Sequence, residues 1–136
     1  AGLDRPLVDH VTTLLAGLAA EGRAVLLITH DLGVVAGFCD DTMVLYGGRV
    51  MEAAPTTAIF DAPGHPYTRG LLRAVPRITE GDVTLSAIPG SPPNQTAAPR
   101  ACPFAPRCVD AIPACHDGLP EFREGRACIR PVEELT

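Results

Sequence analysis

Four cysteines near the C-terminal end have the residue type and spacing of a shared metal or redox site. They are Cys102, Cys108, Cys115 and Cys128, in the pattern C-x5-C-x6-C-x12-C. Zinc sites usually contain close cysteine pairs two to four residues apart, and no such pair occurs here. An iron–sulfur cluster accepts four cysteines at more varied spacing. The spacing alone therefore leaves an iron–sulfur cluster, zinc, disulfides and free thiols open.

A histidine in the N-terminal part has a position suited to phosphate chemistry. Residues 24–29 form a continuous apolar run that predicts a parallel strand buried on both faces, and His30 follows it directly. Ligands of α/β sheets bind at such strand ends, where an imidazole can donate a hydrogen bond to a phosphate. Asp31 is predicted to cap the next helix. A plainer interpretation is that His30 only caps a turn.

Other candidate residues have simpler interpretations. Arg107 adjoins Cys108 and is predicted to favour its thiolate form. Cys39 follows apolar residues of a short helix, which predicts a core position. His65 precedes a proline, so we expect it to cap a helix, and we expect His116 to be a solvated loop residue.

Helices and a hairpin must position these side chains. The periodicity predicts helices over 6–20, with Asp4 as N-cap, 55–60 and 66–74. Strands are predicted over 42–46 and 49–53, joined by a tight turn at Gly47 and Gly48. Arg69, Arg73 and Arg77 recur every four residues and predict a solvated basic face.

Composition narrows the function further. The chain has 136 residues, and all 11 basic residues are arginine against 16 acidic ones, so the formal charge is −5. Without lysine it contains no GK[ST] phosphate-binding loop, and an acidic chain does not suit nucleic acid. No apolar run is long enough to span a membrane. Prolines concentrate after residue 88, which predicts an α/β part over 1–78 and a loop-rich part over 79–136.

Several segments together resemble a known family. Residues 1–4 (AGLD) resemble the D-loop, and 27–32 (LITHDL) the switch-histidine segment, of ATP-binding cassette (ABC) transporter ATPases. Residues 44–52 are similar to the hairpin that follows that histidine. Residues 64–72 (GHPYTRGLL), 88–93 (IPGSPP) and 102–108 (CPFAPRC) narrow the resemblance to the ATP-binding subunits of oligopeptide/dipeptide importers. The resemblance covers almost the whole chain.

This resemblance implies the C-terminal part of an α/β nucleotide-binding domain followed by a small, cysteine-containing extension. His30 would contact the γ-phosphate of ATP and orient the attacking water, and Asp4 would reach toward the site of a partner ATPase. The four cysteines would ligate a [4Fe–4S] cluster, with zinc as the alternative. ATP and Mg would be cofactors of the complete subunit. We expect the chain alone to be inactive, because the P-loop and signature motif of the family are absent from it.

The resemblance also implies partners and a location. A second ATPase subunit, two membrane permeases and an extracytoplasmic peptide-binding protein would complete the system, with no nucleic acid involved. The subunit would be peripheral on the cytoplasmic face of the cell membrane. The alternatives are a stand-alone metal- or redox-binding interaction module, or the ATPase subunit of a related importer for nickel or another small solute.

Overall fold

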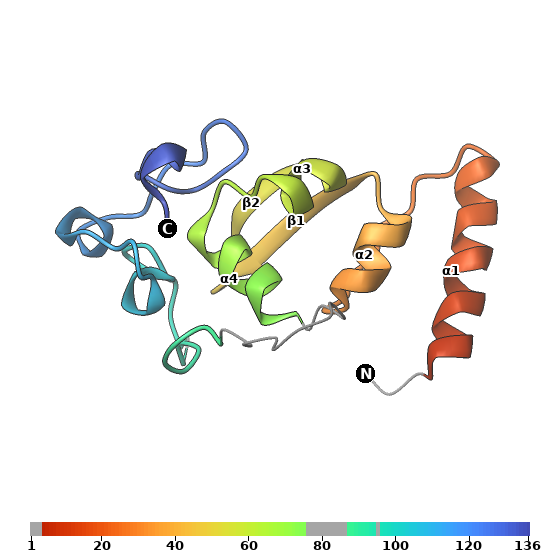
Figure 1. The fold of residues 1–136 in the computed structure, drawn as a ribbon, viewed down its shortest axis with the longest axis horizontal. Coiled ribbons are helices and arrows are strands. Elements are labelled where there is room, and N and C mark those ends of the chain that lie inside the picture. The colour runs from red at the N-terminus through yellow and green to blue at the C-terminus, as the bar shows by residue number, and fades with distance from the viewer. Residues whose placement is uncertain (1–3, 76–86, 95) are drawn as a thin grey trace, which may run out of the picture. The chain divides into compact units, whose positions relative to one another are not determined.

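The structure is a computed structural model that describes residues 4–75, 87–94 and 96–136. It divides into two compact units, 1–40 and 41–136, which are described separately (Figure 1). The predicted boundary at residue 78 lies outside the described residues, as does Arg77. None of the described helices is both long and apolar enough to cross a bilayer.

The first unit contains helices α1 (Arg5–Ala20) and α2 (Leu32–Phe38), which contact each other. Asp4 caps α1 as predicted, because its carboxylate accepts a hydrogen bond from the Leu7 N–H at 3.3 Å. Asp31 caps α2 by accepting from the N–H groups of Gly33 and Val34 at 2.8 and 3.2 Å. Both N-cap predictions are confirmed.

The predicted buried strand over 24–29 is wrong for this chain. These residues form no strand, and the side chains of Leu26 and Ile28 are 88% and 90% exposed. A buried parallel strand needs hydrogen-bonding neighbours on both sides, whereas the only strands in the described residues pair with each other. Cys39 is half-buried rather than part of a core, which also differs from its prediction.

The second unit begins with an antiparallel hairpin of β1 (Asp41–Tyr46) and β2 (Arg49–Pro55). Gly47 and Gly48 form the turn with φ angles of +57° and +71°. Positive φ at both central residues is the geometry that matches the twist of hairpin strands, so the hairpin prediction is confirmed. Helices α3 (Thr56–Asp61) and α4 (Pro66–Ala74) follow at the predicted places.

One aromatic cluster joins the hairpin to the loop-rich segment. Tyr46 of β1, Met51 of β2 and Phe104 are buried together, and Tyr67 of α4 packs against them. The ring of Phe104 lies 5.4 Å from that of Tyr46 and 5.2 Å from that of Tyr67. Residues on both sides of the predicted boundary therefore share one core, because the cysteine-containing loops have few apolar side chains of their own to bury.

The described part of the loop-rich segment, residues 87–94 and 96–136, contains three short 3-10 helices, η1 (Ala105–Arg107), η2 (Pro113–His116) and η3 (Val132–Glu134). The prediction of a solvated basic face on α4 is wrong for Arg69. Its guanidinium donates to the carbonyls of Leu135 at 2.8 Å and Pro63 at 3.0 Å. It thereby ties the last residues to α4, whereas Arg73 is exposed as predicted.

Candidate functional site

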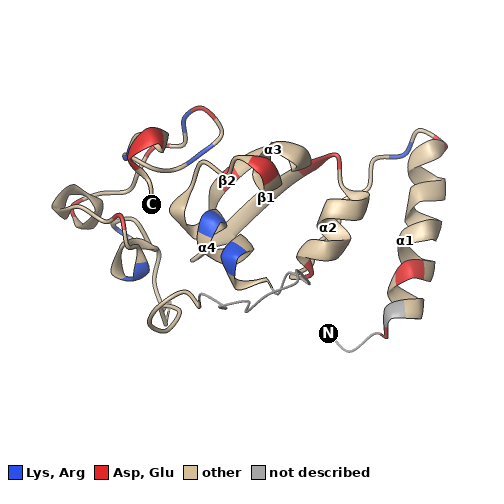
Figure 2. Ribbon diagram, in the orientation of Figure 1, with Lys and Arg blue, Asp and Glu red and all other residues tan. Residues whose placement is uncertain are grey.

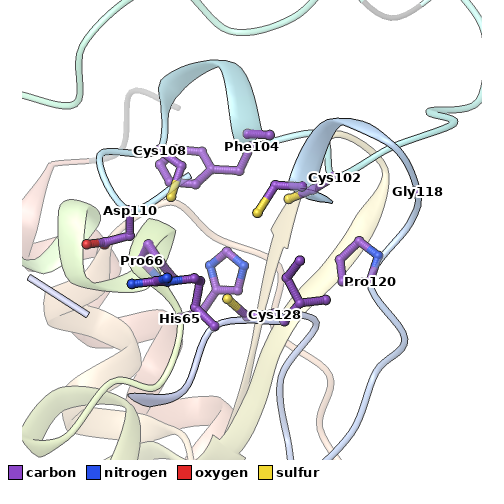
Figure 3. Close-up of a pocket in the computed structure, with 13 residues that line it drawn as sticks. His65, Pro66, Cys102, Phe104, Cys108, Asp110, Gly118, Pro120 and Cys128 are labelled. Atoms are coloured by element: carbon purple, nitrogen blue, oxygen red, sulfur yellow. The ribbon is translucent and has the colours of Figure 1, made fainter. Parts of the chain in front are cut away.

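The four C-terminal cysteines line one pocket. In Figure 3 the sulfurs of Cys102, Cys108 and Cys128 point into a common space beside the imidazole of His65, and Cys115 lines the same pocket. The pocket encloses about 370 Å³ of space free of atoms, part of which is open to solvent. All four cysteines are free thiols, so disulfides play no part in this arrangement.

Short local hydrogen bonds present the first three thiols. The Cys102 carbonyl accepts from the Ala105 N–H, and the Ala105 carbonyl accepts from the Cys108 N–H, which curls the chain around η1. The Cys102 N–H donates to the Cys115 carbonyl at 3.2 Å and brings η2 alongside. Prolines in η1 and η2 fix φ, so these loops hold their shape without longer helices.

Strand β2 positions the fourth thiol. The Ala53 N–H donates to the Gly125 carbonyl at 2.7 Å, and the Ala127 N–H donates to the Met51 carbonyl at 2.8 Å. Residues 125–127 therefore extend the hairpin as a short third ribbon that ends directly before Cys128. Gly125 has φ +80°, and a Cβ there would lie 2.8 Å from the Ala53 carbonyl oxygen, so this close pairing requires glycine.

His65 connects α4 to this pocket through both ring nitrogens. Nδ1 accepts from the Tyr67 N–H at 3.0 Å, which is the helix cap that the sequence predicts. The ring also hydrogen-bonds the backbone of Ala127, so Nε2 carries the proton. The side chain is only 1% exposed, and burial lowers the pKa of His65 to about 4. A neutral imidazole with both nitrogens occupied is a positioning group and not a free ligand.

A buried carboxylate holds the backbone next to His65. Glu52 of β2 accepts from the Gly64 N–H at 2.5 Å and from the His65 N–H at 3.1 Å. Arg126 donates to the Gly64 carbonyl at 3.2 Å and to the Arg130 carbonyl at 2.7 Å. These bonds tie the start of α4 to the segment that carries Cys128.

The pocket favours neutral thiols over thiolates when no positive charge is added. Burial raises the pKa of Cys102 and of Cys128, and it raises the pKa of Cys108 to about 11. The carboxylate of Asp110, which lines the pocket, raises the pKa of Cys108 and Cys128 further, whereas Arg126 lowers that of Cys128. Thiolates here need cations beside them.

The predicted effect of Arg107 on Cys108 is wrong. The Arg107 guanidinium instead donates to the carbonyls of Ile88, Pro89 and Gly90 and to the Tyr46 hydroxyl. Its charge is not among the causes that shift the Cys108 pKa. His116 is exposed, in agreement with its prediction as a solvated residue.

The described residues contain no group of three or more His, Cys, Asp or Glu side chains placed to hold a metal ion. The four thiols share a pocket, but they do not converge on one point at the spacing that a single ion requires. Asp110 and Arg130 also line the pocket, and sequence reasoning missed both. The sequence does not indicate that Asp110 and Arg130 line the pocket, because the direction of each side chain depends on the geometry of its loop.

The other predicted site residues lie in the first unit. His30 is exposed at the end of the extended segment 23–30, immediately before the Asp31 cap of α2. Asp4 is exposed at the start of α1, where its carboxylate is already used as the N-cap. Neither residue belongs to the cysteine pocket.

Comparison with known proteins decides the family. Residues 51–115 match the model of the oligopeptide/dipeptide transporter C-terminal region. Over 98% of its length, the chain is 46% identical to the oligopeptide transport ATP-binding protein OppD of Salmonella typhimurium and 47% identical to that of Escherichia coli. Residues 51–115 belong to the oligopeptide/dipeptide transporter C-terminal family. The resemblance found in the sequence is thereby confirmed.

The matches also define how much of such a protein the chain represents. It spans 41% of the length of each of these two relatives. The dipeptide transport ATP-binding protein DppD of Bacillus subtilis is 48% identical over 60% of the chain, which is 24% of that relative. The family region at 51–115 includes Cys102, Cys108 and Cys115, and it begins within the β1–β2 hairpin.

Proposed function

We propose that this chain forms the C-terminal part of an ATP-hydrolysing subunit that powers import of oligopeptides or dipeptides. The observation that carries this proposal is the similarity to oligopeptide transport ATP-binding proteins along 98% of the chain. Residues 1–78 would complete the nucleotide-binding domain, and 79–136 would form its extension. The subunit would lie on the cytoplasmic face of the membrane with a second ATPase subunit, two permeases and an extracytoplasmic peptide-binding protein.

His30 is proposed to act on the γ-phosphate of ATP. Phosphoryl transfer depends on positioning and charge stabilisation, and an imidazole can donate a hydrogen bond to a γ-phosphate oxygen while the water is held in line. The exposure of His30 next to the capped start of α2 leaves its ring accessible to a nucleotide. Asp4 is proposed to face a partner ATPase across the dimer. ATP and Mg would be held mainly by segments of the subunit outside this chain.

The test of this role compares two exposed histidines in the full-length subunit. We expect His30→Ala to lower ATP hydrolysis and peptide uptake by about 100-fold, since it removes one general acid–base or positioning group. His116→Ala, at the exposed end of η2, is the matched control and should retain both activities. Unchanged hydrolysis by the His30 variant, with nucleotide binding intact, would contradict the assignment.

The cysteine pocket is proposed to hold a [4Fe–4S] cluster. The support for this proposal is that all four thiols line one pocket, and that iron–sulfur clusters are held by four cysteine thiolates. When bound, such a cluster supplies positive iron to the buried thiolates and one-electron redox chemistry. Cys102, Cys108, Cys115 and Cys128 would be its ligands, and we assign it the structural role of fastening loops that have little core.

Metal analysis of the anaerobically purified full-length subunit tests this site. We expect about four iron and four sulfide per chain, brown colour, and loss of both in Cys108→Ser. Cys39→Ser is the control, because Cys39 lies in the other unit and lines no part of the pocket. A content of one zinc per chain would overturn the cluster and support the zinc alternative. Protein that contains neither iron nor zinc would overturn both.

A further inference from the structure

Arg130 brings an unused hydrogen-bond donor to the cysteine pocket. It lies two residues after Cys128 and lines the pocket. Its Nε is buried and has no hydrogen-bond partner among the described residues. The guanidinium is anchored at its other end, where Nη2 pairs with the Glu134 carboxylate at 3.1 Å. The buried Oδ2 of Asp110, in the lining of the same pocket, also has no partner in the described part of the chain, so these two atoms do not pair with each other. Buried donors in folded proteins are nearly always paired, so the Arg130 N–H calls for another acceptor.

The charges around the pocket show what that acceptor would be. The titratable groups that face it besides the four thiols are the neutral His65, the carboxylate of Asp110 and the guanidinium of Arg130. Arg126 acts on Cys128 from nearby. A cluster held by four thiolates carries net negative charge, and its sulfurs accept hydrogen bonds. Asp110 opposes such a charge, whereas Arg130 offsets it.

We propose that Arg130 is the hydrogen-bond donor and counter-charge of the sulfur-ligated group in this pocket. Its Nε–H would donate to a thiolate or sulfide sulfur, while Glu134 holds the far side of the guanidinium in place. This inference rests on the iron–sulfur site proposed above. It makes Arg130 a positioning residue that tunes the bound group, and it explains why an arginine is half-buried directly beside a cysteine loop.

The reduction potential of the cluster tests this role in the full-length subunit. Hydrogen bonds and positive charge near an iron–sulfur cluster favour its more negative, reduced form. We expect Arg130→Met to lower the ratio of reduced to oxidised cluster about tenfold at a fixed applied potential. For a one-electron couple, this change corresponds to a reduction potential that is lower by about 59 mV. Arg130→Lys keeps the charge but loses Nε, and we expect a smaller shift in the same direction.

Arg123 provides the matched control, because it is an exposed arginine of the same segment that pairs with Glu121 at the surface. Arg123→Met should leave the potential unchanged. If the wild-type subunit contains a cluster but Arg130→Met and Arg123→Met have the same reduction potential, the role of Arg130 is overturned. If Arg130→Met assembles no cluster, Arg130→Lys decides: a lowered potential supports the role and an unchanged one overturns it. A wild-type subunit that binds no iron would instead overturn the underlying site.

Discussion

Among the side chains that the structure describes, Arg107 forms the largest set of hydrogen bonds between separate segments. Its guanidinium donates to three successive carbonyls, those of Ile88, Pro89 and Gly90, and to the Tyr46 hydroxyl. The planar fork of arginine suits several acceptors at once, which the single ammonium of lysine cannot replace. This one residue therefore holds the start of the loop-rich segment against the hairpin.

We expect Arg107→Lys to destabilise the second unit by about 2 kcal/mol, because most of these charge-assisted bonds are lost. Denaturant unfolding of the full-length subunit measures this change, and hydrogen exchange at residues 87–94 locates it. Arg123→Lys, at an exposed surface pair, should change stability by less than about 0.5 kcal/mol. Equal stabilities of the two variants would refute the role given to Arg107.

His65 makes the same unit sensitive to acid. Its pKa is about 4 in the folded protein and about 6.5 in an unfolded chain, so the unfolded chain binds more protons between these values. The contribution of His65 to stability should therefore be constant above about pH 7, fall as the pH drops from about 6.5 toward 4, and lose about 3 kcal/mol in total.

Denaturant midpoints measured between pH 4 and 7.5 test this expectation. His65→Asn retains a side-chain acceptor for the helix cap but does not titrate, so its stability should vary less with pH in this window. His116→Asn, at an exposed position, should keep the wild-type dependence. A wild-type protein as stable at pH 4.5 as at pH 7 would show that His65 is not held neutral by burial.

At the scale of elements, the pairing of residues 125–127 with β2 links the hairpin to the cysteine pocket. Gly125 permits this pairing, since its φ of +80° and its distance from the Ala53 carbonyl exclude a side chain. We expect Gly125→Ala to cost about 2 kcal/mol from backbone strain alone and to separate this ribbon from β2. Hydrogen exchange at the Ala53 and Ala127 N–H groups should then become faster.

Gly118→Ala is the control for this change. Gly118 also lies in the cysteine segment, but a Cβ there meets no atom within 4 Å and its φ is not positive. This variant should leave both N–H groups protected. Protection retained in Gly125→Ala as well would mean that the ribbon tolerates a shifted backbone, and Cys128 would not depend on this pairing.

At the scale of the whole molecule, the first unit exposes an apolar surface. Leu14 of α1 is 58% exposed, Leu26 and Ile28 are almost fully exposed, and α1 carries little charge (Figure 2). Large apolar patches on a soluble protein mark surfaces that another chain or segment covers. Under the function proposed above, we expect the rest of the nucleotide-binding domain to cover these side chains.

The 136-residue chain by itself should therefore self-associate as its concentration rises. Leu26→Ser combined with Ile28→Ser should reduce this association, which light scattering measures. Val109→Ser is the control, because Val109 is an exposed apolar residue of the second unit, 71% exposed. A wild-type chain that stays monomeric at all concentrations would refute the prediction.

The sequence alone determined the features that depend on neighbouring residues. Asp4 and Asp31 cap the helices that follow them, His65 and Pro66 start α4, and Gly47 and Gly48 close the hairpin, all as predicted. Each depends on bonds that reach no more than a few residues along the chain. The family was also readable, because its motifs are continuous stretches of sequence.

Only the tertiary structure decided what depends on distant partners. The run over 24–29 has the composition of a buried strand, yet without strands beside it the run forms no strand and leaves Leu26 and Ile28 exposed. The direction of Arg107, and the use of both ring nitrogens of His65, depend on partners dozens of residues away. The spacing indicates the four cysteines as candidate ligands. The pairing of residues 125–127 with β2 and the packing on Phe104 bring them to one pocket.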